Sequence, residues 1–227
     1  MQGSDMILRT VSSKYLAVVI FCAFLVSCAS QKIYRLYTGK KKPVEQVALL
    51  ELLPPELMVS EVFPPPKEIK REGNSITNAF SFNYFAPAIW VVSIDGDSIQ
   101  RFIGERRELH HIDKYTILPG KHKIGMMYKG IIGGIVEVKQ SAQGAGTWFS
   151  SGVSRPFDIS QDFKTPLMLE FETEAGKTYY VETAVKLNAC VVIIKSNETT
   201  VAENVTTDLE LDGDEALIFM MKQNMKK

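Results

Sequence analysis

The sequence predicts a mostly β fold, an antiparallel β-sandwich with short turns and little helix. Two observations favour this class. Short apolar or alternating runs recur along the chain and are separated by Gly, Pro and Asp turns. No long stretch shows the 3.6-residue apolar period of a helix. We therefore expect one β-sandwich domain over residues 44–227, which is long enough to bury a core.

Strand signals are strongest in the middle of the chain. Residues 88–94 are rich in β-branched and aromatic side chains and run directly into Asp-Gly-Asp at 95–97, so they predict a strand that enters a tight turn. Pro119-Gly120 marks another turn. Residues 121–128 then alternate in polarity, as a half-buried strand does.

Further strands are expected after this central region. Residues 168–174 alternate, 175–177 supply the turn sequence Ala-Gly-Lys, and 178–185 return as the predicted partner of a hairpin. Residues 190–195 form one more apolar run, which predicts a buried strand.

Three stretches do not follow the strand pattern. Residues 67–78 are polar and predict a loop. Residues 141–152 are small and uncharged around Trp148 and Phe149, and they predict a flexible hairpin loop. Residues 212–227 fit either a last strand or a short amphipathic helix, because periodicity does not decide at this length.

The N-terminal residues have the pattern of an export signal. Two basic residues precede the 12 apolar residues 15–26, a run too short to span a bilayer core of roughly 30 Å as a helix. Leu25-Val26-Ser27-Cys28 follows at the end of this run. The motif resembles the lipobox of bacterial lipoprotein precursors, in which the cysteine is lipidated and the chain is cut before it.

This resemblance implies a lipoprotein signal peptide at residues 1–27 and a lipidated tether at 28–43, anchored to the membrane through Cys28. Ala29, where inner-membrane lipoproteins of Gram-negative bacteria have Asp, implies the outer membrane. Two alternatives remain open on sequence grounds. An ordinary secretory signal could be cleaved near Ser30, or the segment could stay as an uncleaved anchor.

Composition excludes several classes of protein. The chain has 26 basic and 26 acidic residues, so no overall field attracts nucleic acid. Once Cys28 is acylated and the signal is removed, Cys190 is the last thiol, and no intramolecular disulfide can form. Stability must then come from a hydrophobic core.

The sequence offers no catalytic or metal-binding set, and we expect no enzyme activity, no metal and no cofactor. His110, His111 and His122 are the three histidines, and none lies in a metal-binding motif with Cys or Glu. Adjacent strand residues point to opposite faces, so His110 and His111 could not easily share an ion there. The glycines at 130–134 do not match a phosphate-binding loop.

Two turn motifs carry a second resemblance. Ile94-Asp95-Gly96, and later Leu118-Pro119-Gly120-Lys121-His122, are similar to elements of uncharacterised bacterial envelope lipoproteins and of PEGA-type surface modules. The resemblance implies a β module in the cell envelope and names no activity.

We therefore expect an envelope-anchored structural or interaction module, held at the outer membrane and facing the periplasm or the cell surface. Its partner would be an envelope protein or a glycan. The alternative is a glycan- or peptide-binding module that uses residues 141–152. Trp148 and Phe149 are the candidate interaction residues, because exposed aromatic rings on a flexible loop can insert into a partner.

Overall fold

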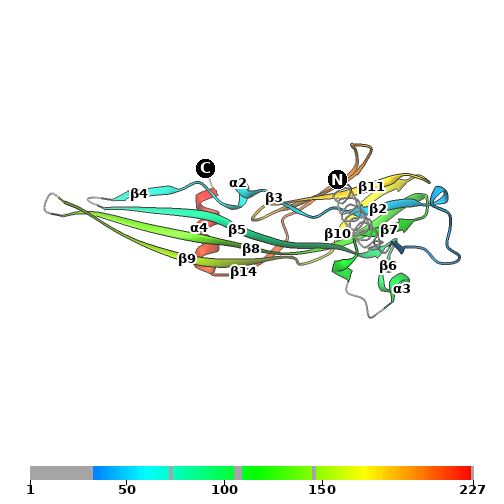
Figure 1. The fold of residues 1–227 in the computed structure, drawn as a ribbon, viewed down its shortest axis with the longest axis horizontal. Helices are drawn as coiled ribbons and strands as arrows, with labels where there is room; N and C mark the ends of the chain where they lie inside the picture. The colour runs from blue at the N-terminus through cyan, green and yellow to red at the C-terminus, as the bar shows by residue number, and fades with distance from the viewer. Residues whose placement is uncertain (1–32, 72–73, 105–108, 145–146, 226–227) are drawn as a thin grey trace, which may run out of the picture. The chain divides into compact units, whose positions relative to one another are not determined.

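The computed structural model describes residues 33–71, 74–104, 109–144 and 147–225 (Figure 1). The chain divides into a short N-terminal unit, Met1–Lys32, and a folded unit, Ile33–Lys227. The predicted signal peptide and the predicted lipidation site at Cys28 lie outside the described residues.

The folded unit is built mostly from strands in two sheets, which confirms the predicted β-sandwich class. The first sheet has, in spatial order, β1 (Tyr34–Arg35), β7 (Lys114–Ile117), β2 (Ala48–Leu52), β11 (Thr178–Val185), β12 (Cys190–Ser196) and β13 (Thr199–Thr206), with β3 (Glu56–Leu57) beside β11. Strand β1 runs parallel to β7, and both β2 and β3 run parallel to β11. This sheet is therefore mixed, where the sequence predicts a purely antiparallel one.

The second sheet is antiparallel throughout its described pairs. Its spatial order is β14 (Leu209–Gly213), β9 (Thr147–Phe163), β8 (Gly120–Gly144), β5 (Asn74–Ile94) and β4 (Lys67–Arg71), with β10 (Leu167–Thr173) beside β8 and β6 (Asp97–Ser98) beside β5.

The described helical segments are short. They are η1 (Val44–Gln46), α2 (Val59–Val62), α3 (Gln100–Ile103), η2 (Leu109–His111) and α4 (Glu215–Met225). Helix α4 settles the ambiguity of the C-terminal stretch. The carboxylate of Asp214 accepts a hydrogen bond from the backbone N–H of Leu217 at 3.1 Å and so caps the helix. Leu217, Ile218 and Met221 then share its buried face.

The main core lies between the two sheets. The alternation predicted for residues 121–128 is confirmed, because Ile124, Met126 and Tyr128 are all fully buried. They meet Leu50, Val181 and other side chains of the first sheet in one apolar cluster. Burial of these side chains is the main source of stability for the sandwich.

A second apolar cluster lies where α4 crosses the strands of the second sheet (Figure 1). Its buried members come from α2, β8, β9, α4 and the connections between strands: Val62, Phe63, Ile132, Val136, Ile159, Leu187, Leu217, Ile218 and Met221.

Two predicted loops are strands in the structure. Residues 67–71 form β4 and residues 74–78 begin β5, while residues 141–144 and 147–152 belong to β8 and β9. Strand β8 has 25 residues and is about 80 Å long at ~3.3 Å per residue. These segments have the small, polar side chains that are typical of loops. They form strands because pairing with the neighbouring strand satisfies their backbone N–H and C=O groups.

The prediction that residues 168–174 and 178–185 pair with each other as a hairpin is wrong. Strand β10 pairs with β8 in the second sheet, whereas β11 pairs with β2 and β12 in the first. The chain crosses from one sheet to the other at 174–177. Phe171 and Tyr179 therefore face the same core from opposite sheets, with ring centroids 5.8 Å apart.

The folded unit also takes in part of the predicted tether. Tyr34 and Arg35 pair with β7, and Leu36 and Tyr37 are buried, with 4% and 7% of their surfaces exposed. Residues from Ile33 onward are thus attached to the first sheet rather than separate from it.

Candidate interaction surface

The most distinctive feature is an extension of the second sheet beyond the sandwich core. We call it the arm and define it as residues 67–71, 74–82, 134–144 and 147–157, which belong to β4, β5, β8 and β9 (Figure 1). The register places Phe82 opposite Gly134, and Gly134 opposite Phe157, at the base of the arm.

The two faces of the arm differ in composition, because side chains alternate along each strand. One face, here called the apolar face, gathers most of the large apolar side chains, and by register it also carries Arg155, Lys67 and Gln140. Cross-strand pairing puts Val136, Val138, Val153 and Phe157 on the same face. Phe80, Ile76 and Ile69 join that face from β5 and β4. The other face carries polar side chains, among them Glu68, Lys70, Thr77, Ser81, Glu137, Lys139 and Ser154.

The part of the apolar face nearest the sandwich is covered. Phe63 packs against Phe82 and Phe157, with ring centroids 5.7 and 6.1 Å away, and α4 covers Val136. Farther out, 53% of Val153 and 42% of Ile69 are exposed. Aliphatic side chains are thus exposed on this face beyond its covered base.

A groove runs along the side of α4. Val138 and Val153 line it from the arm, and Ala216 and Met220 line it from the helix. Arg155 and Asp214 also border the groove. An apolar floor with a polar border is the arrangement that protein interfaces commonly have.

The edge of β9 is less suited to pairing with another strand. Among the described strands, β14 pairs with β9 only at residues 159–163, so residues 147–158 form an edge. Pro156 lies on this edge and lacks an N–H, and Arg155 precedes it. Both residues discourage the addition of a further strand.

Glycines of β8 shape the base of the arm. A Cβ atom at Gly133 would collide with the ring of Tyr84, and one at Gly134 would meet the ring of Phe157. The hydroxyl of Tyr84 donates a 2.6 Å hydrogen bond to Asp158, which raises the pKa of Tyr84. The glycine-rich stretch thus makes room for aromatic rings over the sheet.

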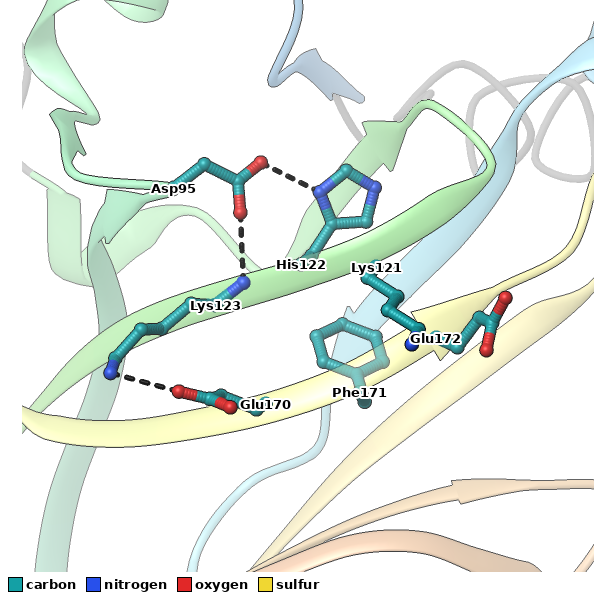
Figure 2. Close-up of a pocket in the computed structure, with 7 residues that line it drawn as sticks. All are labelled: Asp95, Lys121, His122, Lys123, Glu170, Phe171 and Glu172. Carbon is teal, nitrogen blue, oxygen red and sulfur yellow. Dashed lines mark hydrogen bonds and ion pairs between the residues drawn. The ribbon is translucent and has the colours of Figure 1, made fainter.

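A second surface feature is an open pocket around Asp95 and His122 (Figure 2). Nδ1 of His122 lies 2.8 Å from Oδ2 of Asp95, and Nε2 donates to the carbonyl of Leu118 at 2.7 Å. The other oxygen of Asp95 accepts a 2.8 Å hydrogen bond from the backbone N–H of Lys123. Asp95 has a φ of 52° and Gly96 one of 86°, as the predicted tight turn requires.

Two further charges of this pocket are paired with each other. Nζ of Lys123 lies 2.8 Å from a carboxylate oxygen of Glu170, and this contact lowers the pKa of Glu170 (Figure 2). His122 and Asp95 therefore fix the turn between β5 and β6 against the start of β8. These contacts assign them a structural role.

The other histidines lie in η2. The ring of His110 is 4.1 Å from that of His111 and 6.2 Å from that of Trp90, measured between centroids. Within residues 33–71, 74–104, 109–144 and 147–225, no three His, Cys, Asp or Glu side chains gather as a metal site would need. Over the same residues, no helix is both long and apolar enough to cross a membrane.

The interaction residues predicted from sequence lie near the end of the arm. Trp148 is opposite Gln143 and Phe149 is opposite Ala142 in the β8–β9 pairing, so both are in a strand and not in the predicted loop. Their side chains, like Cys28, are outside the described part of the chain.

Sequence reasoning missed the apolar face of the arm. Its signal in β8 was the alternation of Val136 and Val138, whereas in β9 Arg155 interrupts the alternation between Val153 and Phe157. Comparison of the chain with protein-family models, with curated proteins and with solved structures finds no match in any of the three.

Proposed function

We propose that this protein is a lipid-anchored interaction module of the bacterial cell envelope, without enzymatic activity. It binds a partner protein through the apolar face of its arm. The observation that carries this proposal is the exposed apolar surface around Val153 and Ile69, on an arm whose opposite face is polar.

The chemistry of this face favours a protein partner over a glycan. Aliphatic side chains gain free energy mainly when they are removed from water, at roughly 25 cal/mol per Å². They offer no hydrogen bonds to sugar hydroxyl groups. The groove beside α4 has Val138, Val153, Ala216 and Met220 in its lining, which suits an apolar side chain of another protein.

The anchor is supported by the lipobox-like residues 25–28. We expect cells grown with labelled palmitate to label the wild-type protein and not the Cys28→Ala variant. The variant should also leave the membrane fraction. Equal labelling of both proteins would contradict the assignment of Cys28.

The arm can be tested with two neighbouring positions on opposite faces. A photo-crosslinking amino acid at Val153 should capture a discrete partner in cells, and the same group at Ser154 should not. Both positions are exposed and lie in the same strand, so they differ mainly in the face they present. The Val153→Asp variant should lose the partner captured from other positions of the apolar face.

Two results would argue against the arm surface. Identical capture from Val153 and Ser154 would show that contact there is unspecific. Loss of the partner in Trp148→Ala, together with retention in Val153→Asp, would place binding at the end of the hairpin instead.

A further inference from the structure

We infer that Ile33, Arg35 and residues 38–46 form a docking patch that lies on the anionic phospholipid head groups of the membrane. The patch would orient the sandwich on the bilayer. This inference rests on the proposed function, because it requires the lipid anchor at Cys28.

The first support is charge. Arg35, Lys40, Lys41 and Lys42 are all exposed, and Glu45 is the one acidic residue among residues 33–46. Four basic side chains against one acidic side chain give this segment a net charge of +3, in a chain whose formal net charge is zero. Basic charge is thus concentrated close to the predicted anchor, where an anionic surface would attract it.

The second support is exposed apolar surface on both sides of the lysines. Val44 is 71% exposed and Ile33 is 51% exposed. Aliphatic side chains next to lysines suit the boundary between head groups and acyl chains, where each group finds its preferred surroundings. A solvated linker would gain nothing from exposing these two residues.

The third support is that the patch is attached firmly to the sandwich. The backbone N–H of Leu36 donates to the carbonyl of Thr116 at 2.8 Å, next to the pairing of β1 with β7. The hydroxyl of Tyr37 accepts a 3.2 Å hydrogen bond from the N–H of Lys42. The guanidinium of Arg35 donates to the carbonyl of Gly39 at 3.1 Å. Contact of this turn with a membrane would therefore orient the whole sandwich.

The fourth support is reach. Five peptide steps separate Cys28 from Ile33. At no more than ~3.6 Å per residue, they hold Ile33, the first residue of the patch, within about 18 Å of the lipidated cysteine. Electrostatic attraction is screened over about 8 Å at physiological ionic strength, so the lysines contribute when the sandwich lies against the bilayer, as the docked orientation requires.

The test uses the processed, lipidated protein in vesicles of phosphatidylcholine, with or without about a third of phosphatidylglycerol. A fluorophore on the Thr38→Cys variant reports contact with the head groups through quenching by spin-labelled lipids. Thr38 is exposed, whereas the other thiol of the processed chain, Cys190, is buried. We expect strong quenching in anionic vesicles and weak quenching in neutral ones.

Charge reversal provides the matched comparison. Replacing Lys40, Lys41 and Lys42 by Glu should lower the ratio of docked to undocked protein on the order of 100-fold or more, since each lysine contributes roughly fivefold. The double variant Lys121→Glu and Lys222→Glu changes exposed lysines outside the patch and should quench as the unaltered protein does.

The outcomes separate the two proposals. Failure of the protein to sediment with either kind of vesicle would overturn the anchor and the docking together. Normal sedimentation with quenching that ignores lipid charge, or that survives the triple reversal, would overturn the docking patch alone.

Discussion

Gln161 illustrates how single residues connect the two sheets. It lies in β9, is fully buried, and accepts a 3.3 Å hydrogen bond from the hydroxyl of Tyr128. Its amide donates to the carbonyls of Lys186 and Leu187, at 2.6 and 2.8 Å, in the connection that follows β11. One side chain of the second sheet thus satisfies backbone groups in the connection between two strands of the first sheet.

We predict that Gln161→Leu lowers the free energy of unfolding by about 1–3 kcal/mol, because the two carbonyls lose their donor inside the protein. Urea unfolding followed by circular dichroism measures this change. Gln140→Leu is the control, since Gln140 is an exposed residue of β8 and should change stability by less than about 0.5 kcal/mol. A loss of the same size in both variants would contradict the role of Gln161.

Buried acidic groups predict sensitivity to alkaline pH. Burial raises the pKa of the Cys190 thiol from 9.0 to about 12, and it also raises the pKa values of Tyr115 and Tyr128 well above 10.0. These groups ionise more readily in the unfolded chain than in the folded one. Their contribution to the free energy of unfolding is therefore complete below about pH 9 and is lost as the pH rises toward 12.

We predict that the free energy of unfolding falls above about pH 9, by up to ~1.4 kcal/mol per pH unit for each such group. Urea unfolding across a pH series measures the fall, and phenolate absorbance reports when the tyrosines ionise. Ionisation of Tyr115 and Tyr128 at the pH of free tyrosine, with the fold intact, would contradict this prediction.

At the scale of elements, the base of the arm depends on glycine in β8. A Cβ atom at Gly134 would lie 2.5 Å from the carbonyl oxygen of Ser81 and 2.7 Å from the ring of Phe157. The carbonyl belongs to the neighbouring strand and cannot move without disturbing its pairing. Strand β5 and the ring of Phe157 therefore pack so close to Gly134 that they leave no room for a side chain there.

We predict that Gly134→Ala lowers the free energy of unfolding by about 1–3 kcal/mol, because a methyl group must enter a filled space. Thermal and urea unfolding both measure the effect. Gly152→Ala is the matched control in the same hairpin, where the nearest atom would be 3.5 Å away, on the flexible side chain of Lys139. Equal stability of the two variants would contradict this prediction, because it would show that β5 and β8 can move apart to accommodate the methyl group.

The features of the fold that could be predicted are those set by residues close together in the sequence. The turn at Asp95 and the alternation of Ile124, Met126 and Tyr128 depend on neighbours in sequence, and both were predicted. The partner of Thr178–Val185 depends on which sheet the strand joins, and no local pattern carries that information.

The candidate surface escaped prediction for a related reason. Residues 141–152 resemble a loop in composition, yet pairing between β8 and β9 holds residues 141–144 and 147–152 as strands. The apolar face of the arm takes its side chains from four strands, and it becomes visible only when their register is known. The turn residues Asp95 and His122 were identified from their motifs, and the contact between them needed the structure.

At the scale of the whole folded unit, burial is distributed unevenly. The strands of the sandwich contribute fully buried side chains such as Val181, Val192 and Ile194. The outer arm has partly exposed apolar side chains, and Gly152 and its neighbours in β9 are exposed. Local opening is easiest where few apolar contacts must be broken, so the arm and the sandwich should differ in local stability.

We predict that backbone amides of β4 and of residues 147–157 exchange with deuterium on the order of tenfold or more faster than those of β11 and β12. Hydrogen exchange followed by mass spectrometry measures both regions in one sample. The difference should shrink when a partner covers the apolar face, because binding removes Val153 from water and opposes opening. Equal protection of the two regions in the free protein would show that the arm opens only when the sandwich unfolds.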